Sequence, residues 1–206
     1  ASFSHPHDPY VTRQRYWDLY EGADIPLPAV GAANVDPHPH AERLGRMCCW
    51  DGKEVPDDAV RRARRAYLAN VSYVDEWTGR LMETLHGLGL ADDTVVILLS
   101  DHGDMLGERG HWYKCSFHEG SARIPLVIHA PQRLRPGRVA EPVSLVDFLP
   151  TVLELAGLGE QEPVDELAGT FLLPLCDGSR EHSPRTVFGE YMAGGTTAPI
   201  VMIRRG

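Results

Sequence analysis

A carboxylate and an imidazole stand side by side at Asp101 and His102, directly after an apolar run at residues 94–99. Adjacent side chains of these two types can bind one divalent cation if the backbone turns sharply there. Gly103 permits such a turn, and a turn-rich loop then leads to Lys114. The alternative is that Asp101 caps the turn and His102 packs locally, and it explains the triplet alone equally well.

The hydrophobic pattern predicts the elements that must position these residues. Apolar residues three, four or seven apart predict one long helix at residues 56–88, and a second helix is predicted at 144–157. Four apolar runs predict strands, at 94–99, 124–129, 186–191 and 200–204. Strands alternating with helices predict an α/β fold with a mostly parallel sheet flanked by helices. Ligands of such sheets bind outside the carboxyl ends of the strands, where the Asp101–His102 pair lies.

Two segments near the N-terminus lack a periodic pattern. Residues 8–20 predict an irregular or short helical segment, and residues 21–56, rich in Pro and Gly, predict a long loop. Loops of that length in a compact domain are usually functional or disordered.

Composition excludes several classes of protein. The chain has 206 residues, 43% of them apolar, which is enough to bury a core. Its net charge of −9 argues against a nucleic-acid partner, so we interpret the arginines in the long helix as a solvated face: Arg61, Arg62, Arg64 and Arg65. No apolar run approaches the ~18 residues that span a bilayer. We therefore expect no membrane partner and a cytoplasmic location. The cysteines have no zinc-type spacing and are expected to be reduced.

The stretch SDHGDMLGERGHWYK at residues 100–114 resembles a motif of the sulfatases, within the alkaline-phosphatase-like superfamily. The resemblance continues through SFHEGSARIPLVIHAP, VSLVDFLPTVLELAG and LAGTFLLPLCDG. Three stretches are similar in particular to the choline sulfatases: the SFSHPHDPYV opening, the MLGE and WYK parts of the motif, and the closing GEYMAGGTTAPIVMIRRG. The resemblance implies that residues 1–206 form part of a sulfatase catalytic domain, with residues 186–206 starting its C-terminal part.

The resemblance also implies roles for single residues. Asp101 and His102 would bind one divalent cation, and Lys114 would bind the sulfate. His7, in Pro6-His7-Asp8-Pro9, matches the histidine that sulfatases place against the sulfate ester. An ammonium, a cation and an imidazole would stabilise charge on the sulfate oxygens and the leaving group. The donor types suit Ca²⁺ or Mn²⁺, and the imidazole tilts the choice toward Mn²⁺.

Two parts of a sulfatase site are missing from this sequence. Sulfatases use a formylglycine made from a Cys or Ser in a Cys/Ser-x-Pro-x-Arg motif, and none of the four cysteines lies in one. The first two metal-binding carboxylates of the family are missing as well. We therefore expect the chain to be an internal fragment whose nucleophile lies outside it, and we predict that the isolated chain is inactive.

Other polar residues have structural interpretations that we weigh above chemical ones. We expect Glu119 and Arg123 to form an ion pair, and the spacing of Asp147 after Ser144 predicts a helix capping box. Four further residues are expected to shape the lysine loop or to lie around it rather than to act as acids, bases or ligands: Asp104, Glu108, His111 and His118.

The substrate's other end and the reaction class leave alternatives open. A quaternary ammonium is held by aromatic faces and carboxylates, which Glu190 and Tyr191 could supply; Trp112 and Tyr113 are other aromatic candidates. We expect hydrolysis of a small sulfate ester, with choline sulfate favoured. The alternatives are a phosphonate or phosphate ester hydrolase of the same superfamily and a non-catalytic, metal-binding remnant. A homo-oligomer is left open.

Overall fold

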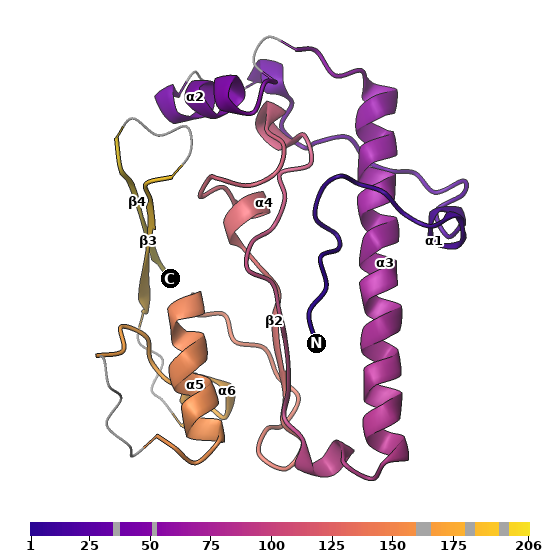
Figure 1. Cartoon of the computed structure of the whole chain (residues 1–206). Coiled ribbons are helices and arrows are strands. Elements are labelled where there is room, and N and C mark those ends of the chain that lie inside the picture. The colour runs from indigo at the N-terminus through magenta and orange to yellow at the C-terminus, as the bar shows by residue number, and fades with distance from the viewer. Residues whose placement is uncertain (35–37, 51–52, 160–165, 180–183, 194–197) are drawn as a thin grey trace.

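A computed structural model describes residues 1–34, 38–50, 53–159, 166–179, 184–193 and 198–206. Helix α3 runs along one side of the molecule, and the arm formed by β1 and β2 lies beside it (Figure 1). The N-terminal segment, drawn in indigo, lies between α3 and this arm (Figure 1). The C-terminal helices and strands lie on the other side of the arm.

The predicted long helix is confirmed as α3, Asp57–Gly87. Asp57 and Asp58 occupy its first turn, where acidic side chains stabilise the positive end of the helix. Gly89 follows with a φ of +69°, a left-handed conformation that glycine adopts without strain. Short helix α1, Gln14–Asp18, packs against it, and the Tyr16 hydroxyl donates a hydrogen bond to Glu76 over 3.0 Å.

The arginine cluster of α3 does more than face solvent. Arg61 donates to the carbonyl of Ile25, Arg64 to that of Leu106 and Arg65 to that of Trp17. Arg61 and Arg62 are exposed, as expected for a solvated face, and Arg62 forms an ion pair with Asp58 one turn away. The cluster therefore ties helix α1 and two loop segments to α3.

The four predicted strands are present, but their pairing differs from the prediction. Strands β1, Val96–Leu99, and β2, Leu126–His129, are antiparallel, and so are β3, Thr186–Tyr191, and β4, Ile200–Arg205. A mostly parallel sheet is not confirmed in the described part of the chain. A parallel pair needs a crossover, usually helical, and between β1 and β2 the chain forms only the turn η3, Glu108–Gly110, and the short helix α4, Glu119–Ala122.

The segment expected to be one long loop is partly ordered. Helix α2, Pro39–Met47, lies within residues 21–56, as does the 3₁₀ turn η1, Ala32–Asn34. Pro39 occupies the first turn of α2, a position that suits its fixed φ, and the His38 side chain accepts a hydrogen bond from the His40 amide. Residues 35–37 and 51–52 of this segment, and 194–197 of the closing motif, lie outside the described residues.

Asp147 holds the C-terminal helices together. The predicted helix begins as the 3₁₀ turn η4, Leu145–Asp147, and continues as α5, Phe148–Leu155, with the expected capping box. The buried Asp147 carboxylate accepts hydrogen bonds from the Ser144 amide (2.9 Å), the Thr170 amide (2.8 Å) and the Arg185 guanidinium (2.8 Å). These bonds join α5 to the segment before helix α6, Leu173–Cys176, and to the start of β3.

None of the helices that the structure describes is both long enough and apolar enough to cross a bilayer.

Replacing Asp147 by Ala should lower the free energy of unfolding by about 3–5 kcal/mol, because it leaves the largely buried Arg185 guanidinium without its carboxylate partner. The matched control is Glu119→Ala, which removes exposed ion pairs to Arg123 and Arg204 and should cost no more than about 1 kcal/mol. Urea unfolding of the protein at its full natural length measures both. Equal costs would show that Asp147 contributes no more than a surface charge.

Candidate functional site

Three of the residues predicted from the sequence line one cavity, and a fourth, Lys114, contacts one of them. Asp101 and His102 follow β1, and the imidazole rings of His7 and His102 lie 5.6 Å apart between centroids. The Lys114 ammonium contacts Nε2 of His7, which lies 107 positions earlier in the chain. A cavity of about 410 Å³ is lined by His7, Asp101 and His102, together with parts of residues 3–6 and 100–104 and Tyr67. The arrangement gathers two imidazoles and a carboxylate around a space for a small anion, with the Lys114 ammonium in contact with one imidazole.

Local hydrogen bonds orient the two histidines. Nδ1 of His7 bonds to the carbonyl of Asp8 over 2.7 Å, so its Nε2 faces Lys114. Nδ1 of His102 bonds to the carbonyl of Gly103 over 2.9 Å, and its Nε2 lies 3.7 Å from a carboxylate oxygen of Asp101. A backbone partner at one ring nitrogen fixes the tautomer and leaves the other nitrogen available as a ligand or proton carrier.

The Asp101–His102 pair offers two converging donors for a cation. The Asp101 side chain is 84% exposed, so an ion can reach it. Desolvation raises the pKa of Asp101, but the His102 charge and hydrogen bonds outweigh it and lower the pKa overall, so the group is a carboxylate at neutral pH. In the described residues no third His, Cys, Asp or Glu side chain joins them in a metal-binding group. The pair fits part of a cation site.

Lys114 is held in a strained loop. The residues on both sides of it, Tyr113 and Cys115, have φ angles of +66° and +72°. Left-handed backbone costs a residue with a side chain roughly 1–2 kcal/mol, and such strain clusters at ligand sites. Surrounding bonds must therefore hold this conformation.

Hydrogen bonds to the Asp104 carboxylate hold this loop. Its carboxylate accepts the amides of Leu106 (2.9 Å) and Tyr113 (3.2 Å), and Oδ2 accepts the hydroxyl of Tyr10 (2.8 Å). Burial raises the pKa of Asp104 although the hydrogen bonds oppose it. Burial and the Asp104 carboxylate raise the pKa of Tyr10, so the phenol stays protonated and donates. Glu108 accepts the amides of Ala29 and Val30. Both acids shape the loop, as expected.

Gly103 is required for a reason other than the one expected from the sequence. Its φ is not left-handed; instead, a Cβ there would lie 2.2 Å from the carbonyl oxygen of Gly120. The Gly103 amide donates to the Ser121 carbonyl over 2.7 Å. Close backbone approach, which only a residue without a side chain allows, brings the turn after β1 against α4.

The remaining weighed residues take structural positions. The expected ion pair between Glu119 and Arg123 is present at 3.4 Å, and Glu119 also pairs with Arg204 at 3.0 Å. His111 is buried, its ring 6.0 Å from that of His118. Burial lowers the pKa of His111, as does its positive neighbourhood, and the imidazole is neutral.

Glu190 and Tyr191 lie on opposite faces of β3, because successive strand residues alternate. Gly189, two residues before Tyr191, packs against the Phe117 ring. Tyr191 shares that face: its ring is 5.6 Å from that of His40, and its hydroxyl bonds to Cys115, next to Lys114. Glu190 faces the other way and is exposed. Sequence reasoning gave no reason to include His40, since its contact with Tyr191 spans most of the chain.

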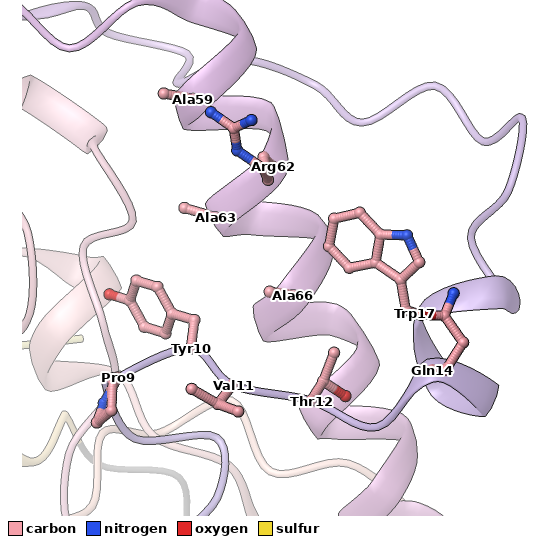
Figure 2. Close-up of a pocket in the computed structure, with 10 residues that line it drawn as sticks. All are labelled: Pro9, Tyr10, Val11, Thr12, Gln14, Trp17, Ala59, Arg62, Ala63 and Ala66. Atoms are coloured by element: carbon pink, nitrogen blue, oxygen red, sulfur yellow. The ribbon is translucent and has the colours of Figure 1, made fainter.

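A second cavity, of about 630 Å³, lies between residues 9–17 and α3. The Tyr10 and Trp17 rings and the small side chains of Ala59, Ala63 and Ala66 border it (Figure 2). The Tyr10 hydroxyl points away from Trp17 in this view, toward its bond with Asp104 (Figure 2). Tyr10 therefore lines this second cavity and is hydrogen-bonded to Asp104, which lines the first.

The family model described as Sulfatase matches residues 1–158. A choline-sulfatase of Rhizobium meliloti is 46% identical over the whole chain, which covers 40% of that protein. An arylsulfatase of Clostridium perfringens is 32% identical over 81% of the chain and 35% of its own length. The solved structure of a phosphonate monoester hydrolase from Silicibacter pomeroyi superposes with a TM-score of 0.82 at 28% identity, covering 97% of this chain and 44% of that one. The chain thus spans less than half of each of these proteins.

Gly103→Ala should lower the free energy of unfolding by about 1–3 kcal/mol or more, the cost of forcing a methyl group into a packed site. Gly79→Ala is the matched control, because nothing lies within 4 Å of a Cβ at this exposed position of α3. It should stabilise the protein by about 0.5–1 kcal/mol. If Ala is tolerated equally at both positions, the close approach to Gly120 is not a constraint.

Proposed function

Because this chain belongs to the sulfatase family, we propose that it carries the sulfate-binding half of a sulfuric ester hydrolase site. One observation carries the proposal: His7 and Lys114, 107 positions apart, contact each other beside the Asp101–His102 pair. A positively charged donor in contact with an imidazole that lines a small cavity suits a sulfate monoester.

Lys114 and His7 have separate tasks in this proposal. Sulfate oxygens gather negative charge as the ester bond breaks, and the Lys114 ammonium stabilises that charge in the transition state. His7 lines the cavity, and when its ring is protonated at both nitrogens it gives the Nε2 proton to the departing alkoxide. The strained backbone on both sides of Lys114 keeps the ammonium in place before the substrate arrives.

Asp101 and His102 would hold one divalent cation, Ca²⁺ or Mn²⁺, and the imidazole favours Mn²⁺. When bound, the cation supplies further positive charge for the sulfate oxygens. His102 is already oriented for this role by its bond to the Gly103 carbonyl. We assign the other ligands and the nucleophile, a formylglycine made from a Cys or Ser, to parts of the protein outside this chain, and we expect the isolated chain to be inactive.

Choline sulfate is the substrate that we propose, supported by the 46% identity to a protein named choline-sulfatase. The structural similarity to a phosphonate monoester hydrolase favours a second candidate, hydrolysis of a phosphonate or phosphate ester at the same site. The two candidates differ in the charge and geometry of the group transferred, so a comparison of kcat/KM on the two ester types separates them.

The full-length protein should hydrolyse choline sulfate faster than a phosphonate monoester, and Lys114→Ala should lower kcat/KM for the sulfate by about 10² or more. Lys53→Ala is the matched control, since Lys53 is the only other lysine in the chain and is exposed. It should leave the rate within about twofold. Faster turnover of the phosphonate would favour the second candidate. Near-normal rates for a folded Lys114→Ala variant would remove the lysine from the site.

The trimethylammonium end of choline sulfate gives a test of Tyr191 and Glu190. We propose Tyr191 as the aromatic contact, because its face of β3 is the one toward Cys115 and Lys114. Tyr191→Leu should lower kcat/KM for choline sulfate by about tenfold relative to a neutral aryl sulfate, as expected for loss of a cation–π contact. Tyr191→Phe keeps the ring and should keep the selectivity.

Glu190→Gln in the same assays decides whether the carboxylate also binds the cation. A loss of about tenfold in kcat/KM on choline sulfate alone would assign Glu190 that role, because a carboxylate attracts a fixed cation. If Tyr191→Leu changes kcat/KM by the same factor on both substrates, Tyr191 does not contact the substrate's cation.

A further inference from the structure

One carboxylate links the two segments that carry His7 and Lys114. Tyr10, three residues after His7, donates its hydroxyl to Oδ2 of Asp104, 94 positions away. Tyr113, directly before Lys114, donates its amide to Oδ1 of the same residue. The Asp104 carboxylate thus links the two segments by hydrogen bonds, in addition to the contact between Lys114 and His7 themselves.

Both carboxylate oxygens of Asp104 already accept hydrogen bonds. Oδ1 accepts two amides, of Leu106 and Tyr113, and Oδ2 accepts the Tyr10 phenol. Three donors occupy three of about four acceptor positions, and a carboxylate bonded in this way serves as a fixed anchor. The Met105 amide adds a bond to the Tyr113 carbonyl over 2.7 Å, so both backbone groups of Tyr113 are held.

We propose that Asp104 is a positioning residue which, through Tyr10 on one side and Tyr113 on the other, sets the separation of His7 from Lys114. This inference rests on the proposed function, since it names how the proposed site is held. Tyr113 has a left-handed backbone that would relax if its amide lost this partner. Relaxation there moves Lys114, and release of Tyr10 lets the His7 segment move.

The distance between the two groups matters more for rate than for binding. A displacement of about 1 Å at a reacting centre can cost as much as 10²-fold in rate. Loss of the link should therefore lower kcat with little change in KM, because the misplaced groups act mainly on the transition state. Loss of general stability would not produce this split.

The test uses Tyr10→Phe in the full-length protein, with choline sulfate and a neutral aryl sulfate as substrates. This change keeps the ring and removes one hydroxyl. We expect kcat to fall about tenfold on both substrates, with KM within about twofold of wild type. Asp104→Asn should lower kcat less, because Oδ1 can still accept the amides and the new amide nitrogen can donate to the Tyr10 oxygen.

Two matched controls separate positioning from packing. Tyr16→Phe removes the hydroxyl bond to Glu76 of α3, at a tyrosine that does not line the cavity beside His7. Tyr20→Phe removes hydroxyl bonds to the Leu68 carbonyl and to Ser72, so it also loosens an N-terminal contact with α3, but outside the site. Both controls should keep kcat within about twofold of wild type.

The double variant Tyr10→Phe/Asp104→Asn should have the same kcat as Tyr10→Phe alone, because both changes act on one link. Independent, multiplicative losses would overturn the inference, and so would a Tyr10→Phe variant that behaves like Tyr16→Phe and Tyr20→Phe. If the wild-type protein hydrolyses no sulfate ester, the proposed function fails and this inference fails with it. A working enzyme with no effect of Tyr10→Phe overturns the inference alone.

Discussion

Three hydrogen bonds to the Asp104 carboxylate connect parts of the chain that are far apart in sequence. The N-terminal segment would otherwise contact α3 mainly through α1 and its tyrosines. The bond from Tyr10 turns this segment toward the loop after β1, and the contact of His7 with Lys114 follows from it. The site is thus assembled from two loops beside α3 and the antiparallel strand pair β1 and β2, which is a common way for a fold to position catalytic groups.

The Asp104 carboxylate also helps to hold the strained conformation of the lysine loop. Tyr113 and Cys115 adopt left-handed backbone on either side of Lys114, and such conformations persist where surrounding bonds over-determine them. The Asp104 carboxylate and the Met105 amide supply those bonds at Tyr113. On the other side of the loop, Gly103 lets the backbone pack against Gly120 without a side chain between them. Stability and site geometry are therefore determined by the same few contacts.

Local signals in the sequence predicted local structure well. The spacing of apolar residues gave the extent of α3, and Ser144 with Asp147 gave the start of the C-terminal helix, because both depend on neighbours a few residues apart. The opposite faces of Glu190 and Tyr191 also follow from the period of two in a strand, and the predicted strand at 186–191 already contained that constraint.

Long-range features could not be predicted in this way. Antiparallel pairing of β1 with β2 depends on what the intervening chain does, and an apolar run is compatible with either direction. The bond between Tyr10 and Asp104 joins two residues whose types suggest nothing about each other. The pairing of His7 with Lys114 was expected only through the resemblance to the sulfatases, which carries three-dimensional information that spacing lacks.

The central claim is that His7, Lys114 and the Asp101–His102 pair face one sulfate group. A crystal structure of the full-length protein with inorganic sulfate and Mn²⁺ tests it most directly. The account predicts a sulfate within hydrogen-bond distance, about 2.7–3.2 Å, of Lys114 Nζ and His7 Nε2, and an anomalous manganese peak bound by Asp101 and His102. A sulfate bound elsewhere, with Lys114 directed away from His7, would contradict it.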